Sequence, residues 1–433
     1  MIMKPLLDWC KPLLLTAVLA VACGSIAKAQ ETNAVPGTNS LTLETAVRLA
    51  LVNNPGLRAS WARTDAAAGR AQLAGKWSNP DLELSAEDWP VDQGNGFSAA
   101  KQLIGISQSL PYPGKKSLDR RIGGVGVKLS GAELAVRRTE VVRDVKAGFY
   151  RVLAAERMME VSSRLVCVAE SAAATAHKRV DAGAAAYQEQ LRAEVQLEQA
   201  RIEQAERQRE LATARRVLAS LIGRPEMESA RISGALVQTP DATLLNTDGQ
   251  DWLARHPSAL AAQANVARAE LEARRAWLEK YPDVKLNVAG GRIGETDESI
   301  VQVGVSIPLP VLDTGRGRER EANANVTVAK AELQAVQQQL LREWGGARER
   351  YRIATIQMTL YFERILPKAE EALRLVQTGF DQGKFSFIDL MDTQRTDAEA
   401  HLTFQEKLFE LSLAQAELEA LLQPQMNSTL ISK

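Results

Sequence analysis

The chain spaces its apolar residues in two ways, and the commoner one is helical. Apolar positions recur every three or four residues over long stretches, which places them on one side of an α-helix. Such stretches cover residues 43–77, 115–180, 186–222, 258–280, 316–378 and 386–422. A helix of about 65 residues is roughly 95 Å long. The pattern therefore predicts a mainly α protein built as a tall cylinder of long helices.

The second spacing has a period of two, which is typical of β-strands. Apolar and polar residues alternate over residues 81–86, 102–110, 283–288 and 301–307. Each segment predicts a strand of about 9 to 11 residues, the length that crosses a bilayer at a tilt. A soluble two-sided hairpin would alternate in the same way, so the period alone leaves both interpretations open.

Aromatic residues and prolines mark the ends of these four segments. Trp77, Tyr112 and Tyr281 lie where strands meet helices, and Trp89 and Phe97 lie at a hairpin tip. Aromatic girdles of this kind flank the strands of outer-membrane barrels. Prolines follow the two return strands, where the chain changes direction: Pro111, Pro113, Pro308 and Pro310.

Four strands per chain cannot close a barrel by themselves. Their open edges would leave backbone hydrogen-bonding groups unpaired in lipid, which a bilayer does not tolerate. If the strands cross a membrane, we therefore expect several chains to contribute four strands each to one transmembrane β-barrel.

The same landmarks occur twice, about 200 residues apart. They are Asn54-Pro55 with His256-Pro257, Asn79-Pro80-Asp81 with Tyr281-Pro282-Asp283, Pro113-Gly114-Lys115 with Thr314-Gly315-Arg316, and Asp181-Ala182-Gly183 with Asp381-Gln382-Gly383. Four landmarks in one order at a nearly constant offset indicate an internal tandem repeat.

The landmarks divide the chain into five parts. Residues 41–222 form the first repeat and residues 258–423 the second, each with a helix, two strands, a long helix and a last helix. Residues 223–257 form a connector that we expect to encircle the helices at mid-height, as an equatorial region. Residues 1–29 form a signal peptide, and residues 424–433 a flexible tail.

The N-terminal segment reads as an export signal. Lys4 and Lys11 accompany an apolar run, Leu13–Ala22, that is too short to span a membrane as a helix. Ala27-Lys28-Ala29 fits the rule for signal-peptidase cleavage. Alternatively, Cys23 ends a loose lipobox and carries a lipid, so the sequence leaves open how the mature chain begins.

Composition excludes several classes of function. The 433 residues include 53 basic and 53 acidic side chains, a balance that argues against nucleic-acid binding. The three Cys and three His are too far apart in sequence for a recognisable metal site or catalytic triad. We therefore expect no enzyme activity and no cofactor.

Several of these segments together resemble the TolC family of outer-membrane efflux factors, from about Leu41 to Leu422. The resemblance is carried by Asn53-Asn54-Pro55, Asn79-Pro80-Asp81-Leu82-Glu83-Leu84, Ile106-Ser107-Gln108-Ser109-Leu110-Pro111, Ser306-Ile307-Pro308-Leu309-Pro310 and Gly383-Lys384-Phe385-Ser386-Phe387-Ile388-Asp389-Leu390. It implies a homotrimer with a β-barrel in the outer membrane and a helical tunnel, an α-barrel, in the periplasm. It further implies a passive exit duct that meets a periplasmic adaptor (membrane fusion) protein and an inner-membrane RND-type pump.

The resemblance also implies where function lies. The two Gly-containing turns would be periplasmic tips that contact the adaptor, through Val180, Asp181, Gly183, Phe380, Asp381 and Gly383. Asp389 and Asp392 match the aspartates that narrow the family's channel entrance as a periplasmic gate. In a trimer they would form six carboxylates that favour cations. Alternatively, Asp389 only caps its helix together with Ser386.

The wording of the strands is similar to the heavy-metal (CzcC-like) branch of the family. This resemblance implies export of heavy-metal cations. Drug or solvent efflux, a type I secretion duct and a periplasmic coiled-coil scaffold remain alternatives, and the sequence does not identify the transported substrate.

Overall fold

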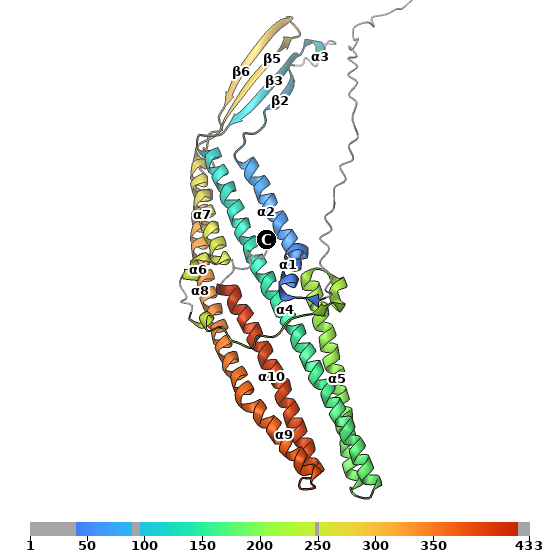
Figure 1. The fold of residues 1–433 in the computed structure, drawn as a ribbon. Coiled ribbons are helices and arrows are strands. Elements are labelled where there is room, and N and C mark those ends of the chain that lie inside the picture. Colours follow the sequence, from blue (N-terminus) through green and yellow to red (C-terminus); the bar gives the residue numbers. More distant parts are fainter. Residues whose placement is uncertain (1–39, 89–95, 247–250, 423–433) are drawn as a thin grey trace, which may run out of the picture. The chain divides into compact units, whose positions relative to one another are not determined.

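The computed structural model describes residues 40–88, 96–246 and 251–422 (Figure 1). The predictions for the signal peptide, for Cys23, for Trp89 and for the tail lie outside these residues, as does the side chain of Phe97. All described residues belong to one compact unit that begins at Ser40.

Eight helices make up most of the described chain. They are α1 (Leu43–Asn53), α2 (Pro55–Ala74), α4 (Lys115–Asp181), α5 (Tyr187–Ile222), α7 (Pro257–Trp277), α8 (Arg316–Leu360), α9 (Leu366–Asp381) and α10 (Phe387–Leu422). Two short helices, α3 (Gly96–Ala99) and α6 (Asp251–Arg255), accompany them. The chain is thus mainly helical, as the apolar spacing predicts.

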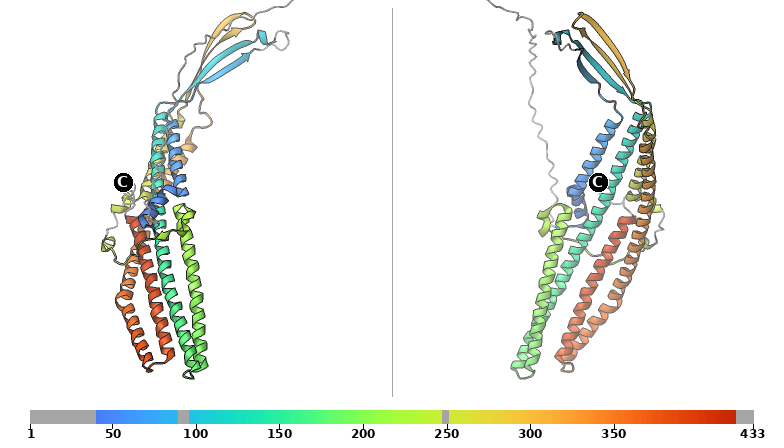
Figure 2. Two further views of the ribbon diagram at one scale, coloured as in Figure 1. Left: turned by 45° about the vertical axis from the view of Figure 1, so that its right-hand side comes forward. Right: turned by 180° about the vertical axis from the view of Figure 1, so that it is seen from behind.

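The longest helix, α4, runs along the length of the helical part and contacts most of the other long helices (Figures 1 and 2). Next to the sheet it lies between α2 and α7, with α8 beyond α7. Toward the other end it lies between α5 and α10, with α9 beyond α10. Two shorter helices therefore follow one another along each long helix.

The first predicted helix, 43–77, is in fact two helices, because the chain turns at Asn54. The Asn54 side chain accepts hydrogen bonds from the N–H groups of Gly56 and Leu57, at 2.9 and 3.2 Å. Pro55 then occupies the first position of α2, where no N–H is needed. In the second repeat His256 does the same, since its Nδ1 accepts from the Ser258 N–H at 3.2 Å.

The second predicted long helix, 316–378, is interrupted as well. Residues Tyr361–Ile365 form one π-helical turn between α8 and α9, where the Leu366 N–H bonds to the Tyr361 carbonyl. The cause is Pro367, which has no N–H for the carbonyl of Glu363 and whose ring crowds that carbonyl. No proline interrupts α4, which is continuous over 67 residues.

Residues of the connector pack against the middle of the helices. Strand β1 (Ser40–Leu41) pairs in parallel with β4 (Arg231–Ile232). The Tyr351 hydroxyl of α8 accepts from the Asp241 N–H at 2.7 Å, and the Ser412 hydroxyl of α10 accepts from the Val237 N–H at 2.9 Å. Buried side chains beneath these contacts form the largest core of the unit, and they include Phe149, Ile222, Leu411 and Leu418.

The other strands form one antiparallel sheet in the order β2–β3–β5–β6. They are β2 (Asp81–Glu87), β3 (Lys101–Leu110), β5 (Val284–Ile293) and β6 (Glu298–Ser306). Strands β3 and β5 meet in the middle of the sheet, where Leu110 lies opposite Val284 and Lys101 opposite Ile293.

An ion pair fixes the junction between this sheet and the helices. Gly114, with φ 95°, turns the chain into α4. The Lys115 Nζ then donates to Asp283 Oδ1 at 2.8 Å, directly before β5, and the Tyr112 N–H donates to the same oxygen at 2.9 Å. Burial alone would raise the pKa of Asp283, but these two hydrogen bonds outweigh it and hold that pKa below its ordinary value.

The turns that follow α4 and α9 have the same hydrogen bonds. In the first, the N–H groups of Gly183 and Ala184 donate to the carbonyls of Val180 and Arg179. In the second, those of Gly383 and Lys384 donate to the carbonyls of Phe380 and Gly379. Both glycines have positive φ, 70° and 73°, so each turn is a Schellman cap.

We predict that Gly183→Ala and Gly383→Ala each lower the free energy of unfolding by about 1 kcal/mol, because an L-residue resists this backbone conformation. The matched control is Gly345→Ala. A Cβ added at Gly345, like one added at Gly183, would meet no atom within 4 Å, but Gly345 lies inside α8 with a helical φ. That change should stabilise by up to about 1 kcal/mol. Urea unfolding in detergent, followed by circular dichroism, measures both, and equal signs would contradict the prediction.

We also predict that Lys115→Met destabilises the protein by about 1–3 kcal/mol at pH 7, because it leaves the Asp283 carboxylate without its cation. Lys115 is 3% exposed and Asp283 39%, so solvent screens part of the effect. The control is Lys116→Met, whose pair with Asp119 is 4.0 Å long and only partly buried, and it should change stability by less than about 0.5 kcal/mol.

The same pair predicts a dependence on acid. A carboxyl whose folded pKa is lowered stabilises the fold above its unfolded pKa, and this contribution disappears as the pH falls through the folded pKa. The difference between wild type and Lys115→Met should therefore narrow below about pH 4. A constant difference between pH 7 and pH 3 would show that the pair does not act as described.

Candidate functional site

One face of the four-stranded sheet is apolar and exposed. The strand register aligns its residues across all four strands, since Leu82 lies opposite Ile106, Ile106 opposite Val288 and Val288 opposite Val303. The large apolar residues of this face are between 39% and 75% exposed: Leu82, Leu84, Ile104, Ile106, Leu286, Val288, Val301, Val303 and Val305. A contiguous apolar surface of this kind indicates contact with a membrane or with another protein.

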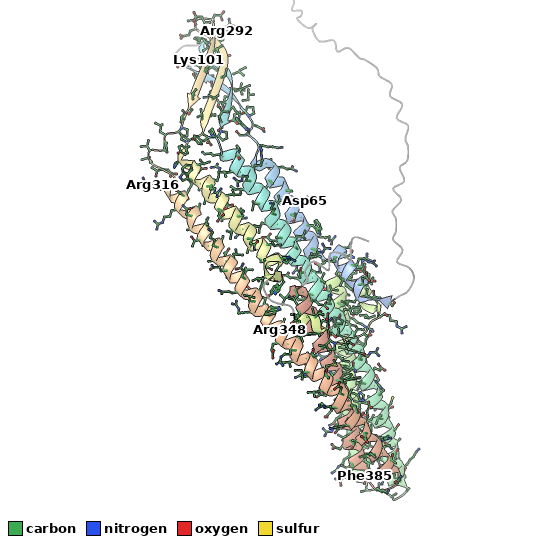
Figure 3. The ribbon with its side chains drawn as sticks, turned by 60° about the vertical axis from the view of Figure 1, so that its left-hand side comes forward. Asp65, Lys101, Arg292, Arg316, Arg348 and Phe385 are labelled. Atoms are coloured by element: carbon green, nitrogen blue, oxygen red, sulfur yellow. The ribbon has the colours of Figure 1, made fainter. Side chains whose placement is uncertain are left out.

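The opposite face of the sheet is polar. Glu83 accepts hydrogen bonds from the Ser107 hydroxyl at 2.7 Å and from the Lys285 ammonium at 3.0 Å, across three strands. At the other end of the strands Lys101, which is labelled in Figure 3, pairs with Glu87 at 3.2 Å. The sheet thus has the two-sided character of a barrel wall with lipid on one side and water on the other.

The two outer strands each have one open edge. Among the described strands, β2 pairs only with β3, and β6 only with β5. Beyond the end of β6 the chain exposes more apolar side chains, with Leu309 77%, Val311 75% and Leu312 100% exposed. Open edges beside an apolar face invite a further strand.

The two helix turns lie side by side (Figures 1 and 2) and touch through aromatic side chains. The Arg179 guanidinium of the first turn lies over the Phe380 ring of the second, 5.4 Å from its centroid. The rings of Phe380 and Phe387 are 6.1 Å apart, and small buried residues of α4 and α5 complete the contact: Ala172, Ala176 and Ala193.

The predicted tip residues all belong to these turns or to the helix ends beside them, but their environments differ. Val180, Asp181, Phe380 and Asp381 end α4 and α9, and Gly183 and Gly383 form the caps. His177 pairs with Asp181 at 2.8 Å. Whether these residues bind a partner stays a prediction.

Tyr187 and Phe387 are the first residues of α5 and α10, but they do not share one environment. Phe387 is 5% exposed, whereas Tyr187 is 61% exposed. Phe385, which the sequence does not single out, is 45% exposed at the tip (Figure 3). Its ring leaves no room for a Cβ at Gly379. The spacing of Gly379 and Phe385 across the turn is the signal that could have indicated this contact.

Asp389, one of the two predicted gate residues, caps its helix. Its carboxylate accepts from the Ser386 hydroxyl at 2.7 Å and from the Ser386 N–H at 2.9 Å, while its own N–H donates back to the Ser386 hydroxyl at 3.2 Å. The two hydrogen bonds that the carboxylate accepts from Ser386 lower the pKa of Asp389 below its ordinary value. The carboxylate is therefore charged, exposed and already used in a capping box.

Asp392, the other predicted gate residue, has a cationic neighbour that the sequence analysis missed. Arg395 donates to its carboxylate at 3.0 Å and to Glu399 at 3.4 Å. The residues are three and four positions apart, a spacing that forms ion pairs on a helix surface and is readable from sequence. Both Asp392 and Arg395 are largely exposed.

The described residues contain neither a metal-binding cluster nor a helix that could span a membrane. No group of three or more His, Cys, Asp or Glu residues there is arranged to hold a metal ion. No described helix is long and apolar enough to cross a membrane.

Comparison with known proteins gives the context of this geometry. The family model described as "Outer membrane efflux protein" matches residues 46–224 and 249–422. The cobalt-zinc-cadmium resistance protein CzcC of Cupriavidus metallidurans is 28% identical over 372 residues, which are 84% of this chain and 85% of CzcC.

Solved structures share the fold. The outer membrane channel CmeC of Campylobacter jejuni superposes with a TM-score of 0.78 at 14% identity, over 88% of this chain and 85% of CmeC. CusC superposes with a TM-score of 0.72 at 17% identity, over 88% of this chain and 91% of CusC. The predictions of an efflux-channel fold, of an outer-membrane location and of no enzymatic role are thereby confirmed. The chain belongs to the outer membrane efflux protein family.

Proposed function

We propose that this protein is the outer-membrane exit duct of a three-part efflux system and that it works as a homotrimer. The observation that carries the proposal is the sheet, which joins an exposed apolar face to two open edges. Three copies with four strands each would close a twelve-stranded barrel in the outer membrane and leave no edge in lipid. Their helices would continue the duct as a tunnel in the periplasm.

A tandem repeat supports this symmetry. We divide the mature chain into repeats 41–222 and 258–423, with a connector at 223–257, after a signal peptide at 1–29. Matching hydrogen bonds at the turns, offset by 200 residues, support the division. Two similar repeats in each of three chains would give a ring with nearly sixfold symmetry.

The two turns are the proposed docking site for a periplasmic adaptor, which would link the duct to an inner-membrane RND-type pump. Their position at the end of the helices opposite the sheet supports this role (Figure 1). Exposed Tyr187 and Phe385 offer apolar contacts there, beside the polar pair of His177 and Asp181.

We further propose that the exported substrates are heavy-metal cations. The relative CzcC is named for resistance to cobalt, zinc and cadmium, and it is similar over most of both chains. The polar sheet face, with Glu83 and Ser107, suits the passage of hydrated cations.

The entrance would be mildly rather than strongly acidic. The first nine residues of α10, 387–395, carry Asp389 and Asp392 against Arg395, so their net charge is −2 + 1 = −1 per chain. Six carboxylates around the axis of a trimer would therefore stand beside three guanidinium groups. Such a ring would still favour cations. The Asp389 carboxylate is held by its hydrogen bonds with Ser386, so we expect changes at Asp392 to alter the selectivity of the ring without disturbing the helix cap.

We predict that deletion of the gene makes cells sensitive to cobalt, zinc or cadmium salts and that the wild-type gene restores resistance. Val303→Arg should fail to restore it, because a charge on the lipid face of a barrel costs about 2–4 kcal/mol. Gln302→Arg is the matched control, since the neighbouring residue lies on the polar face. Sensitivity to dyes and antibiotics with normal metal tolerance would transfer the proposal to drug efflux.

At the gate, we predict that Asp392→Asn removes cation selectivity in planar bilayers, because the net charge of residues 387–395 becomes −1 + 1 = 0. Ser386→Ala is the control that separates capping from gating. It removes the cap but keeps both carboxylates, so it should lower the stability of the tip and leave the permeability ratio unchanged. Unchanged selectivity in Asp392→Asn would exclude Asp392 from the gate.

A further inference from the structure

The joint between the two repeats is an interface that the chain makes with itself. Strand β3 and helix α4 of the first repeat meet strand β5 and helix α7 of the second. The contact is closed by the ion pair of Lys115 with Asp283 and by strand pairing that ends with Leu110 opposite Val284. It shows how a first repeat and a second repeat of this sequence fit together.

The residues of this joint have counterparts on the two outer sides of the chain. Asp283 in Tyr281-Pro282-Asp283 corresponds to Asp81 in Asn79-Pro80-Asp81. Lys115, which follows Gly114, corresponds to Arg316, which follows Gly315. Both glycines are left-handed, with φ 95° and 74°, so the two long helices begin in the same way.

The two hairpins also keep the same register. In the first hairpin Asp81 lies opposite Ser107, and in the second Lys285 lies opposite Ser306. If the residue numbers of β2 are raised by 202 and those of β3 by 201, the pair Asp81–Ser107 becomes 283–308. This pair lies in the same register as the observed pair Lys285–Ser306. The offsets that match the ion pair therefore also match the strands.

The outer counterparts have opposite charges, and both are largely exposed in the described chain. Arg316 is exposed and makes no ion pair with any described residue; it projects from the start of α8 beside the sheet (Figure 3). The Asp81 side chain is 73% exposed, and its nearest cation, Lys285, is 4.0 Å away. One lies at the β6 side of the sheet and the other at the β2 side.

We propose that Arg316 binds Asp81 of the partner subunit, in the geometry of the Lys115–Asp283 pair, and thereby sets the register between copies of this chain. The inference rests on the homotrimer proposed above and adds the residues that join its members. The same translation brings Val311 opposite Leu82 of the partner subunit. These two side chains are 75% and 69% exposed in the single chain, and the contact would cover them.

The test of the ion pair is a charge exchange in the full-length protein, purified in detergent. Asp81→Arg and Arg316→Asp should each speed dissociation of the oligomer at least about tenfold, and the double variant should return to within about twofold of wild type. Arg318→Asp is the matched control, because Arg318 pairs with Asp313 of its own chain at 2.8 Å and should not affect dissociation. Native mass spectrometry after heating measures the remaining oligomer.

Cysteine cross-linking tests the register without relying on charge. In a Cys167→Ser background, which removes the exposed free thiol, Leu82→Cys with Val311→Cys should form a disulfide between chains on oxidation. Directly opposite residues in antiparallel strands have Cβ atoms close enough for this bond. Leu84→Cys with Val311→Cys is displaced by one pair and should cross-link far less.

The outcomes separate this inference from the trimer itself. A stable wild-type trimer whose double variant dissociates as fast as the worse single variant would overturn the ion pair, and cross-linking at the displaced pair would overturn the register. Either result leaves the trimer intact. A wild-type protein that is monomeric in detergent and in native membranes would overturn both proposals.

Discussion

The sheet imposes the constraint on which the rest of the molecule depends. Its apolar face needs a non-aqueous neighbour, and its outer strands need hydrogen-bonding partners that the described part of the chain does not supply. Membership of an outer-membrane family provides the neighbour, and further copies of the same chain would provide the partners. Helix α4 follows β3 closely, and the Lys115–Asp283 pair joins its start to the start of β5, so this pair ties the helices to the sheet.

The helices satisfy a different requirement, because they must stay ordered over a length that no compact core supports. Helix α4 meets this by serving as a common spine, with shorter helices from both repeats packed along it. The core is concentrated where the connector crosses the middle, around Phe149, Tyr351 and Leu411. Toward the turns the contacts become thinner and consist of alanines and a few aromatic rings.

Sequence patterns predicted most of the fold because the patterns are long. A continuous apolar stripe located α4 to within one or two residues of its observed ends, and left-handed glycines located both turns. The failures were local. Pro367 breaks the second long helix through a single missing N–H, and Asn54 breaks the first. Tyr187 is exposed and Phe387 is buried because different helices lie beside them. The local sequence around each residue does not reveal which helix that is. At the gate, Asp392 was found by resemblance, but its pairing with Arg395 was missed although the spacing was visible.

The separation of the core from the sheet has a consequence for biogenesis. Within a single chain the helices already enclose an apolar core, which includes Phe149 and Leu411, so the helical part has a core that does not depend on the sheet. The sheet has no such independence, since alone it would expose its apolar face to water and both edges to any passing strand. In the proposed homotrimer, insertion into the bilayer would therefore be coupled to association of the copies, and the yield of mature channels would rise steeply with the concentration of newly exported chains.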